Sequence, residues 1–173
     1  MRYHKVFFYV SLSVLLLFIF SCMEWQNSLS ETKLSFDLIA TGQQCPPAPK
    51  TWRATWICSQ EEFRQLMLRC RANRMASSGK ETPFVDFKKF GVLALEMGQR
   101  DSAGYGFDTA NIEAYLKGQT AIIRLEYFRS AAGTLTAQVM TSPWIMIRLP
   151  AGLFRNIRIL DQRSRVLAQI ESL

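Results

Sequence analysis

Short runs in which hydrophobic and polar residues alternate constrain the fold of this chain more than any other feature, because a period of two fits a strand. The clearest runs bring Leu34, Phe36 and Leu38, or Ile145 and Ile147, onto a single face. Turn residues separate many of the runs, which is typical of strands joined by hairpins. Strands are predicted at residues 34–40, 52–58, 92–97, 110–116, 120–128, 144–149, 157–159 and 166–170.

One segment between these strands has the period of an α-helix instead. Ser59 and Glu62 have the spacing of a capping box, and the apolar residues that follow share one helical face. These are Phe63, Leu66, Met67 and Cys70. The sequence thus predicts a mainly β fold, an antiparallel sandwich or partly open barrel of about eight strands with one packed α-helix near residues 59–72.

The N-terminus resembles a bacterial lipoprotein signal. Basic residues precede an apolar run, residues 6–20, which is shorter than the ~20 residues of a membrane-spanning helix. The run leads into Ile19-Phe20-Ser21-Cys22, in which Phe20 is bulkier than the usual residue. The resemblance implies cleavage before Cys22 and acylation of that cysteine with chains such as palmitate. An uncleaved signal anchor and a soluble secreted product are the alternatives.

We therefore expect three parts in the chain. Residues 1–21 are the signal peptide, residues 22–33 are the lipidated cysteine and its tether, and residues 34–173 are a single β-rich domain. The expected location is the bacterial cell envelope, on the periplasmic or the surface-exposed side. No aspartate directly follows Cys22, which favours the outer membrane over the inner one. The expected contact with the membrane is through the N-terminal lipid.

Acylation of Cys22 leaves three cysteines for disulfide chemistry. Disulfides form outside the inner membrane, and an odd number of cysteines leaves one thiol unpaired within the chain. Pairing of Cys58 with Cys70 is slightly favoured because it joins a strand to the following helix, and pairing of Cys45 with Cys58 is the other option. The three cysteines lack the spacing of a zinc site, so no metal is expected.

The residue types exclude most catalytic chemistry. The single histidine, His4, lies in the signal, so the mature chain lacks histidine-dependent triads and histidine-bound zinc. A carboxylate pair is the remaining option, with candidates Glu96, Asp101, Asp108, Glu113 and Glu126, but these residues fit solvated charges. We expect no enzyme, no cofactor, no small-molecule substrate and no nucleic acid.

The chain carries a net charge of +7, and many of its arginines are near the C-terminus. A basic face there suits an anionic lipid or an acidic partner, although a merely solvated face explains it as well. These arginines are Arg148, Arg155, Arg158, Arg163 and Arg165.

Residues 92–107 are the best candidate for a binding loop. A buried strand runs into a loop with Gly98, Gly104 and Gly106, where glycine permits positive φ and close backbone approach. Tyr105 is the aromatic residue of the loop. A loop on a stiff strand suits partner binding, but a plain turn with Tyr105 folded onto the core has the same composition.

The segment from Pro83 to about Leu149 resembles the PrcB C-terminal domain family, which is named for a protease-complex subunit. The matching motifs are Pro83-Phe84-Val85-Asp86-Phe87, Gly98-Gln99-Arg100-Asp101-Ser102-Ala103-Gly104-Tyr105, Thr141-Ser142-Pro143 and Leu149-Pro150. Ala103 stands where the family has glycine, which costs on the order of 1 kcal/mol if the site needs positive φ. The resemblance implies a non-enzymatic, lipid-anchored accessory protein that binds or stabilises a protein partner, with a secreted peptidase as a candidate.

A second similarity is to chagasin-type inhibitors of cysteine peptidases, which present a Gly-Tyr loop beside a Pro-Trp loop. Here Ser102-Ala103-Gly104-Tyr105 and Ser142-Pro143-Trp144 correspond to those loops, although the Asn-Pro of the first loop is missing. The predicted partner surface accordingly comprises Gly98, Gln99, Ser102, Gly104, Tyr105, Pro143 and Trp144. Direct peptidase inhibition is one alternative function. The other is a structural envelope lipoprotein, in which Tyr105 and Trp144 are buried.

Overall fold

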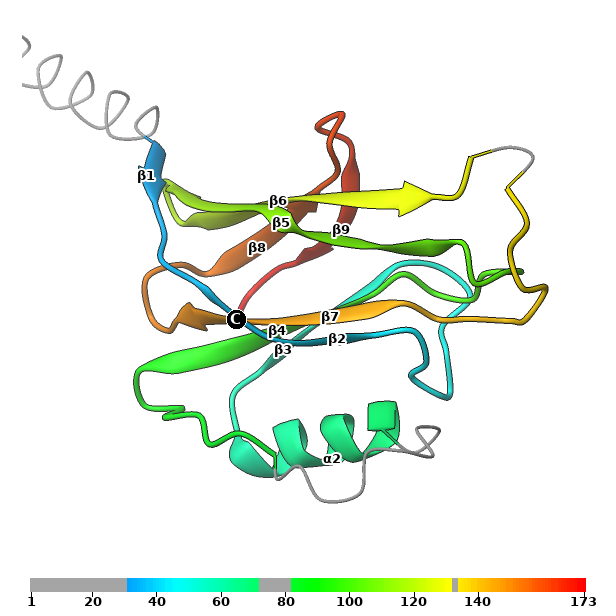
Figure 1. Ribbon diagram of the computed structural model, residues 1–173. Helices are drawn as coiled ribbons and strands as arrows, with labels where there is room; N and C mark the ends of the chain where they lie inside the picture. Colours follow the sequence, from blue (N-terminus) through cyan, green and yellow to red (C-terminus); the bar gives the residue numbers. More distant parts are fainter. Residues whose placement is uncertain (1–30, 72–81, 132–133) are drawn as a thin grey trace, which may run out of the picture.

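The computed structural model describes residues 31–71, 82–131 and 134–173, and these form two facing β-sheets with a helix packed on one of them (Figure 1). The predicted β-sandwich with one helix is therefore confirmed, and the sheets do not close into a barrel. The described elements are β1 (Glu31–Lys33), β2 (Asp37–Gly42), β3 (Arg53–Ile57), α2 (Gln60–Arg71), β4 (Phe90–Glu96), β5 (Tyr105–Lys117), β6 (Thr120–Arg129), β7 (Trp144–Pro150), β8 (Asn156–Leu160) and β9 (Val166–Ile170).

The first sheet has the strand order β1-β5-β6-β8-β9 and contains one parallel pair. All its other neighbours are antiparallel, as predicted, but β6 and β8 run in the same direction, with Thr120 opposite Asn156. The reason is the path of the chain: after β6 it crosses to the other sheet, forms β7, and returns to place β8 beside β6. A parallel neighbour requires such a crossover connection.

The second sheet has the order β2-β7-β4-β3 and is covered on both faces. Its inner face meets the first sheet, where Ile145, Ile147 and Leu149 of β7 join the main core. Its outer face lies against α2, and Trp144 and Met146 belong to this second core (Figure 1). The predicted division of β7 into two faces is thus confirmed. Burial on both sides explains why β4 is almost continuously hydrophobic.

The predicted helix is confirmed as α2. The backbone N–H of Glu62 donates to Ser59 Oγ at 3.2 Å, so Ser59 caps the helix as expected. The Glu62 carboxylate reaches back one residue further than a standard capping box and accepts from the N–H of Cys58 at 3.4 Å. Phe63, Met67 and Cys70 are buried under the sheet. The helix is therefore fixed by its apolar stripe and by its first turn.

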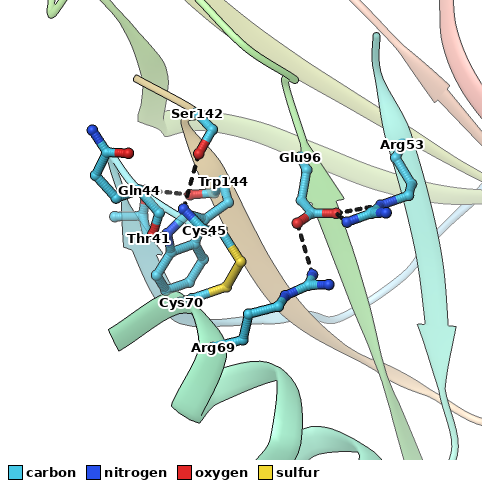
Figure 2. Close-up of a disulfide and its surroundings, with 9 residues drawn as sticks. All are labelled: Thr41, Gln44, Cys45, Arg53, Arg69, Cys70, Glu96, Ser142 and Trp144. Carbon is cyan, nitrogen blue, oxygen red and sulfur yellow. Dashed lines mark hydrogen bonds and ion pairs between the residues drawn. A yellow bond between two sulfur atoms is a disulfide. The ribbon is translucent and has the colours of Figure 1, made fainter. Parts of the chain in front are cut away.

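The structure corrects the predicted disulfide. Cys45 pairs with Cys70 (Figure 2). Cys58 is exposed and carries a free thiol. Cys58 lies just before α2 begins at Gln60, and Cys70 is the next-to-last residue of the helix. The 12-residue helix is roughly 18 Å long. A disulfide requires Cα atoms within about 7 Å, so the helix itself separates Cys58 from Cys70. The bond instead ties the proline-rich loop after β2 to the C-terminal end of α2.

The N-terminal expectations fall mostly outside the described residues. The signal peptide, Cys22 and most of the tether lie in residues 1–30, which the structure does not describe. The last three tether residues, 31–33, are in fact strand β1, which pairs with the end of β5. No helix among the described residues is long and apolar enough to cross a membrane.

Candidate partner-binding site at one end of the sandwich

Two segments far apart in the chain lie side by side at one end of the sandwich. The Met97 N–H donates to the Pro143 carbonyl at 2.8 Å, and Arg100 and Thr141 exchange two backbone hydrogen bonds at 2.8 and 2.9 Å. The Thr141 hydroxyl donates to the Ser102 carbonyl at 2.8 Å. The structure therefore brings the predicted glycine loop and the predicted Ser-Pro-Trp segment together, as neighbouring strands β4 and β7 require.

The glycines of the loop permit close packing of the backbone. Gly98 has a φ of +84°, and a Cβ there would lie 2.7 Å from the carbonyl oxygen of Thr51. At Gly104 a Cβ would lie 2.7 Å from Ser130 Oγ, so glycine lets the end of β6 approach. Ala103 is not among the residues with positive φ. Alanine in place of the family's glycine consequently causes no backbone strain.

Pro143 and Trp144 are buried, which corrects their prediction as surface anchors. Trp144 is only 2% exposed, and its indole N–H donates to the Gln44 carbonyl at 2.9 Å (Figure 2). The Thr41 hydroxyl donates to the backbone carbonyl of Trp144 at 3.0 Å. The side chain points away from the inner core as predicted, but α2 and the Cys45–Cys70 bond cover that face. The similarity to an inhibitor with an exposed Pro-Trp loop is not matched by this geometry.

Tyr105 is half-buried between charged and aromatic groups. The guanidinium groups of Arg100 and Arg129 each lie over its ring at 5.6 Å from the centroid. Arg100 also lies 5.8 Å from the ring of Trp52 and donates to the carbonyls of Gln99 and Met97. Such cation–π contacts hold Tyr105 in place. It is therefore a support for the loop and not a free tip residue.

The accessible side chains at this end come mainly from the segment between β6 and β7. Leu135 is 101% exposed, Val139 51% and Met140 62%, and Gln99 of the glycine loop is also exposed. Sequence reasoning missed the first three because it treated this segment as a connection. The available signal was a cluster of large apolar residues outside any predicted strand, since such residues are seldom exposed together without a role.

A polar hollow of about 420 Å³ lies beside these apolar side chains. Two predicted residues, Ser102 and Gly104, contribute to it, and hydroxyl groups and one guanidinium complete the wall. Its described lining is Asp101, Ser102, Gly104, Arg129, Ser130, Ala131, Thr134, Thr136 and Gln138. Met140 and Gln99 also border a second, smaller hollow of about 260 Å³, together with Pro46 and Pro47. The surface therefore offers both apolar contacts and hydrogen-bonding groups.

Comparison with known families connects this end of the molecule to a described group of proteins. Strands β5 to β7, most of β4 and both segments that meet at the site lie in a stretch that matches one family model, described as PrcB C-terminal. Residues 92–150 match this model, which covers about a third of the chain. The family resemblance drawn from the sequence motifs is confirmed. No curated protein and no solved structure matches the chain.

The buried carboxylates of the molecule are engaged in structure. Glu96, the last residue of β4, is 3% exposed and forms ion pairs with Arg53 and with Arg69, the latter at 2.8 Å (Figure 2). It ties α2 to the sheet. Asp161 is fully buried and accepts hydrogen bonds from the side chain and backbone of Arg165. Neither carboxylate is free for acid–base work, and the described part of the chain holds no group of three metal-binding side chains.

Proposed function

We propose that this chain is a lipid-anchored accessory protein of the cell envelope that binds and stabilises a protein partner, with a secreted peptidase as the candidate partner. The observation that carries the proposal is the PrcB C-terminal match over residues 92–150, a family named for a subunit of a protease complex. The chemistry of the described residues supports a binding role, because the buried carboxylates are paired and the exposed groups at the site suit contact.

We place the contact on the tip surface, defined as Gln99, Ser102, Leu135, Val139 and Met140. Three of these are large apolar side chains exposed by half or more. Burying a leucine or methionine side chain against a partner contributes about 1.5–3 kcal/mol each. A few such anchors supply most of the affinity of a protein interface. The tip surface takes the place of the predicted surface around Trp144, because the Trp144 side chain is buried in the second core.

The position of the tip surface is consistent with an N-terminal anchor. Strand β1, where the described chain begins, pairs with the last residues of β5, whereas the glycine loop enters β5 at its first residue. Figure 1 shows β1 and the segment between β6 and β7 at opposite ends of the sandwich. The 13 residues of β5 span roughly 40 Å. The described chain therefore begins at the end of the sandwich opposite the tip surface.

Affinity purification from detergent-solubilised envelope tests the partner surface. The Leu135→Asp, Met140→Asp double variant should reduce recovery of the co-purified peptidase at least about tenfold, since two apolar contacts are replaced by charges. Leu153→Asp is the matched control, because Leu153 is 53% exposed in the turn after β7, at the β1 end of the sandwich. Undiminished recovery with the double variant would contradict the proposal and favour a structural envelope lipoprotein.

The anchor is tested separately at Cys22. Cys22→Ser should abolish incorporation of labelled palmitate and release the protein from the membrane fraction, because the acylated sulfur is lost. Cys58→Ser is the control, since Cys58 is a free thiol that lies within the folded domain. Retained label in Cys22→Ser would contradict lipidation at that residue.

A further inference from the structure

The tip surface contains a backbone stretch without regular secondary structure, residues 135–139, whose hydrogen-bonding groups are largely unused within the described part of the chain. Between β6 and β7 the Ala137 carbonyl accepts from the Ala103 N–H at 3.0 Å, and the Met140 carbonyl accepts from the Gln44 side chain at 2.8 Å. Leu135, Gln138 and Val139 make no hydrogen bond to any other residue that the structure describes. Exposed N–H and C=O groups of this kind are a template for pairing with another chain.

The side chains of this stretch point in two directions with a period of two. Thr136 and Gln138 line the polar hollow, whereas Leu135, Ala137 and Val139 do not line it. All of these residues except the half-buried Thr136 are exposed to solvent. This is the alternation of a strand that has one polar face and one apolar face. An added strand would gain backbone hydrogen bonds along the stretch and apolar contacts with its outward side chains.

Arg129 supplies a positive charge, which favours an added strand that carries acidic side chains. It is exposed at the end of β6, lines the polar hollow, and lies over the Tyr105 ring at 5.6 Å. Within the described ranges it has no ion pair, in contrast to Arg124 on the same strand, which pairs with Glu113 at 3.3 Å. A guanidinium held by an aromatic ring and lacking a carboxylate suits an acidic side chain of a partner.

We propose that residues 135–139 and the Arg129 hollow together form a docking site for an extended, acidic segment of a partner protein, which adds as a strand to the tip surface. This inference rests on the proposed partner-binding function and specifies its chemistry. Without Arg2 and Lys5 of the proposed signal peptide the net charge falls from +7 to +5, which still favours an acidic partner. Asp101 in the same hollow disfavours a phosphate, whereas a peptide brings both N–H donors and carboxylates and so matches Asp101 and Arg129 together.

The test uses three fluorescein-labelled synthetic nonapeptides and fluorescence anisotropy with the mature protein in detergent. The first alternates valine with aspartate, the second replaces every aspartate by lysine, and the third is the first with proline at its centre. The aspartate peptide should bind at least about tenfold more tightly than the lysine peptide because of Arg129. It should also bind at least about tenfold more tightly than the proline peptide, because proline removes a backbone donor.

Variants at the docking site make the result specific. Arg129→Gln should weaken binding of the aspartate peptide about tenfold, and Arg129→Glu should reverse the preference toward the lysine peptide. Arg158→Gln is the matched control, since Arg158 is exposed on β8 and likewise has no ion pair among the described residues. A gained preference for lysine in Arg129→Glu cannot come from unfolding, so it separates a binding effect from a loss of structure.

Two outcomes would overturn the docking site. One is that the aspartate and lysine peptides bind the wild-type protein equally tightly. The other is that the proline peptide binds it as tightly as the aspartate peptide does. If either occurs while the Leu135→Asp, Met140→Asp variant still loses its partner, the docking mode is wrong and the proposed function stands. If that double variant keeps its partner as well, both are wrong.

Discussion

Removal of the Cys45–Cys70 disulfide should be the most informative perturbation of this fold. The bond joins the loop after β2 to the end of α2 across a sequence separation of 25 residues, and both cysteines are buried. The perturbation is the double substitution Cys45→Ala, Cys70→Ala, which leaves no unpaired buried thiol. It tests the corrected pairing directly, because the predicted pair involved Cys58.

The expected magnitude follows from the length of the closed loop. The chain-entropy relation for a loop of this separation gives about 3.5 kcal/mol at 25 °C. The folded protein loses this stability when the cross-link is removed, because the unfolded chain regains conformational entropy. With an m-value of about 2 kcal/mol per molar urea, the unfolding midpoint should fall by about 1.7 M. The two missing sulfur atoms leave space in the second core, which adds to the loss.

Urea unfolding followed by tryptophan fluorescence under non-reducing conditions measures this loss. Cys58→Ala is the control and should change the free energy of unfolding by no more than about 0.5 kcal/mol, because Cys58 is exposed and unpaired. Non-reducing peptide mapping should recover one linked fragment that contains Cys45 and Cys70. A midpoint that falls in Cys58→Ala and stays constant in the double variant would refute the reasoning.

Three further substitutions test the site and its support. Gly98→Ala should destabilise the fold by about 1–3 kcal/mol in urea unfolding, because φ is +84° and the new Cβ meets a backbone oxygen; an unchanged midpoint would contradict the loop geometry. Glu96→Gln should cost about 2–4 kcal/mol, since a buried carboxylate that pairs with two arginines loses its charge, and a thermal scan that shows no loss would be inconsistent with those pairs. Burial raises the pKa of Asp161, but hydrogen bonds from Arg165 and from backbone amides hold that pKa below its usual value. Its stabilisation is thus present above about pH 4 and is lost as pH falls further, so Asp161→Asn should lower the urea midpoint at pH 7 and have a smaller effect at pH 3; equal losses at both values would argue against this linkage.

Local patterns predicted the elements well because the residues that specify a strand or a helix are close together in the sequence. The alternation of Ile145 and Ile147 with Trp144 and Met146 correctly divided β7 into two faces. Ser59 marked the start of α2, and the glycine at position 98 marked a turn with positive φ. Each of these features depends on residues within a few positions of one another.

The candidate site was predicted only in part. The sequence identified the glycine loop, and the structure sets it beside residues 141–143 as expected from their motifs. It did not show that Trp144 is buried, because an alternating pattern tells which face a side chain occupies but not what covers that face. It also missed Leu135 and Val139, which are exposed and with which none of the described strands pairs.

What the sequence determined by itself is the set of strands, the capped helix and the match of residues 92–150 to the PrcB C-terminal model. Only the tertiary structure decided that Cys45 meets Cys70, that β8 runs parallel to β6, and that the tip surface is built from the connection before β7. The physical reason is distance along the chain. These contacts join residues that are 25 or more positions apart. They are determined by the packing of the two sheets and the helix, and a pattern among neighbouring residues cannot predict them.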